Sequence, residues 1–271
     1  MKIDFQNKNL KLPVMIILGL LMVHSIVGSI SLKAFFNVTA LEIIAAGILL
    51  SVIISFSFET LLNTVYMVKA SFFHKIDYAS DIYKIHSLAV KIKKDGVLSI
   101  SSDISGEDHI FLRDAMTLLN DYKKPEVMQD IMKKDIESRK IHLYRPYNVL
   151  KMVAHVAPSF GLVGTLLGLI GLLSNMAETQ HIMNNMASAL VSTLYGSLIA
   201  NFIAVPLMGR LKEYIDKNVL HYQIIMEGIL LIAKNDSARN VFDKMNVMLK
   251  EDERLTYPRR ERTADIYEYG S

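Results

Sequence analysis

Long runs of apolar residues, free of lysine and arginine, alternate with charged segments along this chain. The runs cover about residues 12–31, 39–58, 152–176 and 183–208. Each is long enough for a helix to cross the hydrocarbon core of a bilayer, which needs about 20 apolar residues. The pattern predicts four transmembrane helices, and the first run is too long for the apolar region of a signal peptide.

The charged segment between the second and third runs, residues 59–151, has a helical hydrophobic period. Apolar residues recur every three or four positions from Ile82 to Ile92 and again from Phe111 to Tyr122. Pro125 then suits the first turn of a further helix, because its fixed φ is compatible with that position. This segment is predicted to form a helical domain.

Together these patterns predict an all-α integral membrane protein with four transmembrane helices. A helical cytoplasmic domain lies between the second and third helices, and a cytoplasmic C-terminal tail, residues 209–271, follows the fourth. We expect the tail to be helical to about Leu249. The remainder is polar and charged, so we expect disorder there.

The positive charges fall almost entirely on one side of the predicted spans. Lys33 alone lies in the short loops 32–38 and 177–182, so the other 29 of the 30 lysines and arginines flank the opposite ends. Because positive residues favour the cytoplasmic side, residues 1–11, the 59–151 domain and the tail are predicted to be cytoplasmic.

Composition narrows the possible functions. The chain is 51% hydrophobic and has a mean hydropathy of +0.28, which favours a membrane protein over a soluble one. It has no cysteine, so a disulfide framework and thiolate chemistry are excluded. The net charge of +3 does not indicate nucleic-acid binding. We find no catalytic array, phosphate loop or metal-ligand spacing, so we expect no enzyme, no cofactor and no metal.

Small residues form a stripe on each of the last two spans. The stripe on the third span consists of Ala157, Gly161, Gly164, Gly168 and Gly171. The stripe on the fourth consists of Ser188, Ser192, Gly196, Ala200 and Ala204, and the polar row beside it consists of Ala189, Thr193, Ser197 and Asn201. Small residues let membrane helices approach closely, so helix packing is one interpretation, and a polar path between helices is the other.

Each of these spans also carries a proline and a threonine, Pro158 with Thr165 and Pro206 with Thr193. We expect each proline to break its helix near the cytoplasmic end and to free a carbonyl. A hydroxyl and a free carbonyl can replace part of the hydration shell of an ion. Neither span contains Asp or Glu, which ion relays usually need, so the carboxylate is expected to come from another chain.

These stretches resemble a known family. The sequences VAPSFGLVGTLLGLIGLLSNM and MASALVSTLYGSLIANFIAVPLMGRL, with the order of spans, resemble the MotA/PomA family of flagellar stator subunits. The resemblance implies that five such subunits surround a dimer of a MotB/PomB-like partner, which has one membrane helix bearing the essential aspartate and a peptidoglycan-binding domain. It also implies a multi-pass protein of the bacterial inner membrane that couples ion flow to rotation by pushing on the rotor switch protein FliG.

The resemblance assigns roles along the ion pathway. Pro158 and Pro206 match the two functional prolines of the family, and Thr193 matches the threonine nearest the partner's aspartate. Ser192 takes a position often held by a second threonine, and Thr165 matches a hydroxyl prominent in sodium-driven members. By contrast, His155 stands where a sodium-driven subgroup has an aspartate. We expect protons as the transported ion, with sodium as the alternative.

The stretch KIKKDGVLSISSDI resembles the part of the family that contacts the rotor. Lys93 and Lys94 keep its basic side, but Ser101 replaces a glutamate of the family. Both lysines are therefore candidates for the rotor contact. The other interpretation of this basic run is a solvated face beside anionic membrane lipid.

Two further functions remain possible from the sequence. One is an ExbB/TolQ-like subunit that energises an outer-membrane system, although those relatives have three spans rather than four. The other is a passive membrane scaffold, which would explain the small-residue stripes but not the placement of hydroxyls and prolines.

Overall fold

The computed structural model describes residues 13–14, 16–21, 24–25, 36–121, 123–174 and 179–258. Every regular element among them is helical, which confirms the all-α prediction. Half of the predicted first span, residues 12–31, and the end of the predicted tail lie outside the described residues.

The chain divides into two units. The membrane unit comprises residues 1–62 and 148–208, and the polar unit comprises residues 63–147 and 209–271.

In chain order the described elements are α3 (Val38–Ser55), α4 (Phe58–Phe73), α5 (Tyr78–Asp95), η1 (Val97–Ile100), α6 (Ser101–Ser105), α7 (Ile110–Asn120), α8 (Pro125–Ser174), α9 (Thr179–Leu198), η2 (Ile199–Ala204), α10 (Val205–Ala233), α11 (Ala238–Val247) and η3 (Glu251–Glu253).

Three described stretches of helix are long and apolar enough to cross a membrane. They are Val38–Ser55, Pro125–Ser174 and Asn185–Ala233. They contain most of the predicted second, third and fourth spans. Half of the first predicted span lies outside the described residues, so a total of four stays a prediction.

The second span ends earlier than its hydrophobic run suggests. The side chain of Asn37 caps the start of α3 by accepting a hydrogen bond from the Ala40 N–H at 3.0 Å. At the other end Phe56 is extended, and the Ser57 hydroxyl accepts from the Thr60 N–H at 3.3 Å. The Ser57 hydroxyl thus acts as the cap of a new helix, so α4 begins inside the predicted 39–58 run.

The third span is the end of one long helix rather than a separate element. We expected one helix from Pro125 and another over residues 152–176, but α8 runs unbroken for 50 residues from Pro125 to Ser174. Pro125 lies at its first position, as its fixed φ favours. Pro146 and Pro158 lie within α8 and also leave it continuous.

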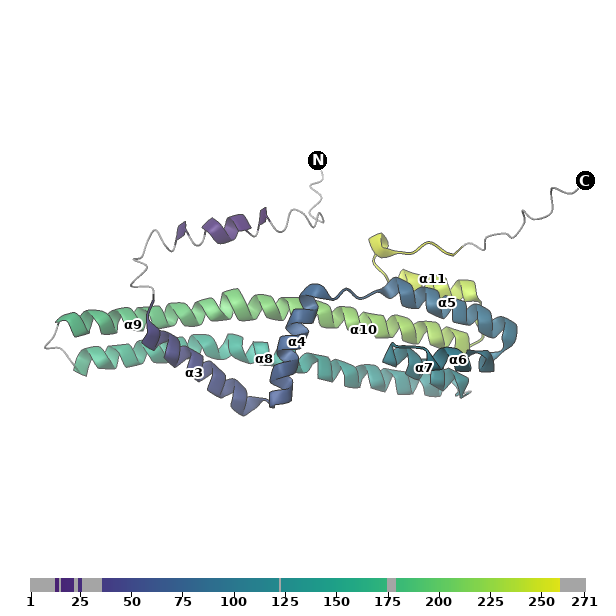
Figure 1. The fold of residues 1–271 in the computed structure, drawn as a ribbon, viewed down its shortest axis with the longest axis horizontal. Helices are drawn as coiled ribbons and strands as arrows, with labels where there is room; N and C mark the ends of the chain where they lie inside the picture. The colour runs from purple at the N-terminus through teal and green to yellow at the C-terminus, as the bar shows by residue number, and fades with distance from the viewer. Residues whose placement is uncertain are drawn as a thin grey trace, which may run out of the picture. The chain divides into compact units, whose positions relative to one another are not determined.

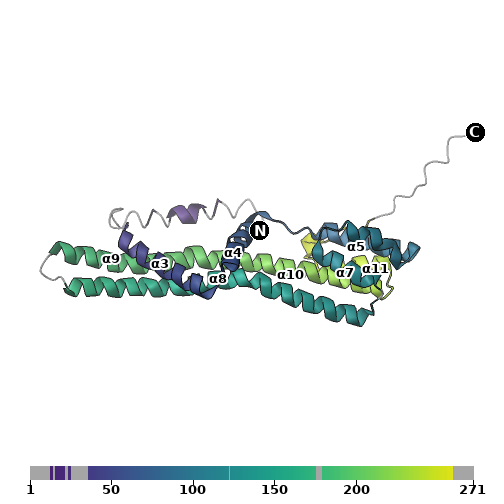
Figure 2. The same ribbon diagram turned by 60° about the horizontal axis from the view of Figure 1, so that its bottom comes forward.

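In the membrane unit, α9 lies antiparallel to the C-terminal half of α8, and α3 lies across this pair (Figures 1 and 2). Large apolar side chains point outward from all three helices; Ile54 is 76% exposed and Leu190 is 70% exposed. Such a continuous apolar surface requires lipid or another protein to cover it. The residues buried inside this unit are mostly small.

The polar unit has a conventional hydrophobic core. Its largest fully buried side chains include Phe111 on α7, Phe242 on α11, and Ile82 and Ile85 on α5. Figure 1 shows α5 lying against α11, and the C-terminal half of α10 contributes Ile224 and its neighbours to the same core. Burying each such side chain contributes about 1.5–3 kcal/mol.

Candidate functional site

Two threonine hydroxyls meet where α8 packs against α9 in the membrane unit. The Thr165 and Thr193 hydroxyls are hydrogen-bonded to each other. The Thr165 Oγ1 also lies 3.1 Å from the carbonyl oxygens of Gly161 and Ala189, and the Thr193 Oγ1 lies 3.4 Å from the Gly161 oxygen. The sequence placed both hydroxyls on their helices; the structure brings them together.

This hydroxyl pair is at the surface of the unit rather than inside it. Thr193 is exposed and Thr165 is half-buried. A hydroxyl donates one hydrogen bond and accepts two, so the pair retains capacity to accept from, or donate to, a group beside Thr193. Such an arrangement can pass a proton or replace water around a cation, but it contains no group that titrates near neutral pH.

Ser192, predicted to lie on the small-residue stripe of the fourth span and to contribute to the ion pathway, faces the glycines of α8. It is fully buried, and its hydroxyl donates to the Ser188 carbonyl at 2.8 Å. A Cβ added to Gly164 would lie 2.5 Å from the Ser192 Oγ, so these two residues are in direct contact. In the single chain Ser192 packs α9 against α8, apart from the Thr165–Thr193 pair.

The glycines bring the two backbones into contact. A Cβ on Gly196 would come within 2.5 Å of the Ala157 carbonyl oxygen, and one on Gly168 within 2.7 Å of the Ala189 Cβ. Gly161 is similarly close to the Ser192 carbonyl, at 3.0 Å from its added Cβ. Side chains therefore have no room along this seam. Ala200, predicted to lie on the same stripe, is also buried.

A polar cluster that the sequence analysis missed connects α3 to α9. The Asn37 N–H donates to the Tyr195 hydroxyl at 3.2 Å, and the Ser188 hydroxyl donates to the Asn37 Oδ1 at 3.3 Å. Asn37 thus caps α3 and binds α9 with the same side chain. An asparagine directly before an apolar helix is a recognisable capping signal, but its partners on α9 are distant in sequence.

The two prolines do not break their helices, contrary to our expectation. Pro158 lies exposed inside the continuous α8. Pro206 lies exposed at the second position of α10, just after the wider π-helical turn η2, where the Val205 N–H bonds to the Ala200 carbonyl. This turn shifts the hydrogen-bond pattern by one residue, so the chain passes Pro206 without ending the helix.

Lys93, one of the two predicted rotor contacts, has partners within the polar unit. Its ammonium donates to the backbone oxygen and the Oδ1 of Asn235, both at 3.0 Å. Asn235 follows α10 and has a positive φ of 60°, so Lys93 stabilises the turn into α11. Lys94 is exposed on the last turn of α5, and Ser101 begins α6 with its hydroxyl bonded to the Leu98 oxygen at 2.9 Å.

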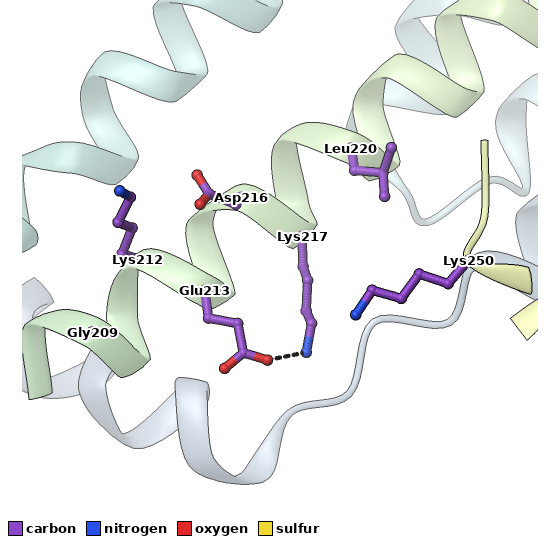
Figure 3. Close-up of a pocket in the computed structure, with 7 residues that line it drawn as sticks. All are labelled: Gly209, Lys212, Glu213, Asp216, Lys217, Leu220 and Lys250. Atoms are coloured by element: carbon purple, nitrogen blue, oxygen red, sulfur yellow. Dashed lines mark hydrogen bonds and ion pairs between the residues drawn. The ribbon is translucent and has the colours of Figure 1, made fainter. Parts of the chain in front are cut away.

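A cavity of about 410 Å³ lies beside the first turns of α10 in the polar unit (Figure 3). Lys212, Lys217 and Lys250 line it together with Glu213 and Asp216. Glu213 and Lys217 form an ion pair at 2.7 Å. Because both signs of charge alternate around the opening, it has no strong preference for an anion or a cation.

Comparison with known proteins finds a family that part of this chain resembles. A model of the MotA/TolQ/ExbB proton channel family matches residues 103–224, which include the glycine seam and both threonines. This part of the chain is similar to that family. The match confirms the resemblance noted from the two membrane stretches, and the family is one of proton channels rather than enzymes.

Individual proteins are similar to this chain over most of its length. PomA of Vibrio alginolyticus, a chemotaxis protein, is 29% identical over 83% of this chain and 88% of its own. YtxD of Bacillus subtilis, an uncharacterised protein, is 28% identical over 93% of this chain and 94% of its own. The structure of Campylobacter jejuni MotAB superposes with a TM-score of 0.79, at 20% identity, over 91% of this chain and 97% of that one.

Proposed function

We propose that this chain is an ion-conducting stator subunit of the bacterial flagellar motor. It provides the wall of a proton path across the inner membrane and couples the flow to rotation. The observation that carries the proposal is the Thr165–Thr193 hydroxyl pair at the exposed edge of two apolar helices. The near full-length similarity to a chemotaxis protein supports it.

The chemistry of the pair requires a partner. The hydroxyls accept and donate hydrogen bonds, but the third and fourth spans contain no Asp or Glu to hold a proton. We propose that a MotB/PomB-like single-span, peptidoglycan-binding subunit supplies the carboxylate beside Thr193. Pro158 and Pro206 are also exposed on these helices, so they are available to the same partner helix.

The assembly and orientation follow the same proposal. Five copies surround a dimer of the partner, and the exposed apolar side chains of α3, α8 and α9 face lipid, neighbouring copies or the partner. The polar unit and both termini are cytoplasmic. There the polar unit pushes on the rotor switch protein FliG, with Lys94 a better candidate for the contact than Lys93, whose ammonium is bound to Asn235.

The test of the proposal is Thr193→Val, which keeps the shape of the side chain and removes its hydroxyl. We expect swimming to fall at least tenfold, while the amount of protein in the membrane and its co-purification with the partner stay the same. Ser174→Ala is the matched control, because the Ser174 hydroxyl donates to the Ile170 carbonyl of its own helix at 2.9 Å. Normal swimming by Thr193→Val would contradict a role in ion passage.

The identity of the ion is tested separately. If protons drive the motor, cells that rely on this stator will swim at unchanged speed when sodium in the buffer is replaced by potassium. Loss of swimming in the potassium buffer would assign sodium as the ion and leave the stator function in place.

A further inference from the structure

Three side chains of metal-ligating type converge inside the polar unit, outside the site described above. Asp81 is on α5, His109 directly precedes α7, and His221 is on α10. One ligand atom from each of the three lies within 4.8 Å of the others. They are far apart in the sequence, so no spacing motif could have revealed them.

Two of the three are almost completely buried, with Asp81 5% exposed and His221 7% exposed. The His221 Nε2 lies 2.8 Å from the Asp81 Oδ2, yet it is buried and makes no hydrogen bond of acceptable geometry with any described residue. Buried polar atoms in proteins nearly always have a satisfied partner. The position of this nitrogen is therefore unusual, and a cation bound between it and the carboxylate would satisfy both.

The third side chain has a competing role. The His109 Nδ1 accepts a hydrogen bond from the Leu112 N–H at 3.2 Å and so caps α7. This bond requires a lone pair on Nδ1, which places the proton of the neutral ring on Nε2. Coordination through Nε2 moves that proton to Nδ1, and coordination through Nδ1 uses the lone pair directly. In either case the Leu112 N–H loses its acceptor, so metal binding and capping exclude each other.

Charged side chains lie close to these three residues. Lys84 lies 3.8 Å from the Oδ1 of Asp81, on the oxygen that faces away from His221, and it is paired with Glu107 at 3.2 Å. Glu107 also accepts from the His109 N–H at 2.9 Å, so a second carboxylate stands next to the cluster. Arg139 is a second cation near His109, and it is itself ion-paired with Asp135 at 2.9 Å and with Asp114 at 3.3 Å. Both cations near the cluster therefore have carboxylate partners.

We propose that Asp81, His109 and His221 form a binding site for a divalent transition-metal ion of the zinc type, which ties α5, α7 and α10 together. Two imidazoles and one carboxylate are ligands that zinc accepts, with water in the fourth position. Calcium and magnesium prefer six or more oxygen ligands, so this set disfavours them. The ion acts here as a structural link within the polar unit, independently of the proton path.

The experiment uses the full-length chain in detergent, stripped with a chelator and then titrated with Zn²⁺, with bound metal measured by elemental analysis. We expect one zinc per chain and a rise in the midpoint of thermal unfolding. Replacing zinc with Co²⁺ is expected to produce the visible absorption of a four-coordinate site. Hydrogen exchange at the Leu112 amide is expected to become faster when zinc binds, because its acceptor is lost.

The variant that isolates the site is His109→Asn. Asparagine is a good helix cap, so α7 keeps its capping while the metal ligand is removed. We expect at least a tenfold loss of zinc affinity in this variant, whereas His86→Asn, at a histidine of the same unit outside the cluster, keeps the affinity of the original chain. Equal zinc binding by His109→Asn, or loss of binding in His86→Asn alone, would overturn the site. So would the absence of one bound zinc per chain.

Discussion

The membrane unit and the polar unit are stabilised by opposite kinds of side chain. In the polar unit, large residues such as Phe111 and Phe242 are buried and fill the space between helices. In the membrane unit, the residues at the helix contact are Ala157, Gly161 and Gly196, while large apolar residues point outward. Lipid tails are as apolar as leucine, so burying large side chains between membrane helices adds little stability. Close contact between the backbones is therefore the main source of stability at this interface.

Because of this difference, a change in side-chain volume affects the stability of the two units in opposite directions. The polar unit loses stability when a buried side chain is made smaller, because a cavity remains. The membrane unit loses stability when a side chain is made larger, because the backbones at the glycine seam cannot separate without losing their contacts. Each of the following variants examines one side of this comparison.

The largest effect is expected for Phe242→Ala in the core of the polar unit. Phe242 is 1% exposed, and its removal leaves a cavity between α5 and α11 that costs about 3–5 kcal/mol. Unfolding of the full-length chain in detergent, with hydrogen exchange of α5 and α11, measures the loss. Val247→Ala on the same helix is the control, since Val247 is 61% exposed and its truncation is expected to change little. Equal effects of the two variants would refute a packed core.

A smaller loss, of about 1–3 kcal/mol, is expected for Gly196→Ala in the membrane unit, because its new Cβ would lie 2.5 Å from the Ala157 oxygen. The thermal midpoint in detergent and the recovery of the assembled complex report the effect. Gly209→Ala is the control: its Cβ would meet nothing within 4 Å, and alanine favours helix over glycine by about 1 kcal/mol. The comparison fails if Gly196→Ala is as stable as the original chain.

Lys93→Met is expected to cost about 1 kcal/mol, because it removes the hydrogen bonds to Asn235. Lys94→Met, at the exposed neighbour, is expected to leave stability unchanged. Measuring thermal midpoint and motor torque for both variants separates folding from rotor contact. If Lys93→Met lowers torque without lowering stability, then the charge of Lys93 acts outside the chain, contrary to its position in the structure.

The smallest effect concerns pH and is confined to the polar unit. Burial lowers the pKa of His86 from its ordinary 6.5. Its neutral form is therefore favoured by folding, so the stability it contributes is present above 6.5 and is lost as the pH falls through the lower folded value. We expect His86→Gln to reduce the loss of stability on acidification, measured by the thermal midpoint between pH 7 and pH 5. His142→Gln, at an exposed histidine, is the control variant.

Much of the fold was predictable because it depends on local patterns. The apolar runs predicted three helices that the structure describes, and Pro125 predicted the start of α8. The small residues recur at helical spacing, so a shared face for Gly161, Gly164 and Gly168 followed from the period alone. A helix's own geometry determines which of its residues share a face, and that information is entirely within the sequence.

The tertiary structure decided everything that depends on which faces meet. Ser192 and Thr193 are neighbours in sequence, but only the packing of α9 on α8 places the first inside and the second at the surface. In the same way, the contact of Lys93 with Asn235 and the meeting of Asp81 with His221 join residues from different helices. Periodicity identifies the faces of each helix, whereas contacts between distant segments depend on the relative placement of helices, which no local pattern contains.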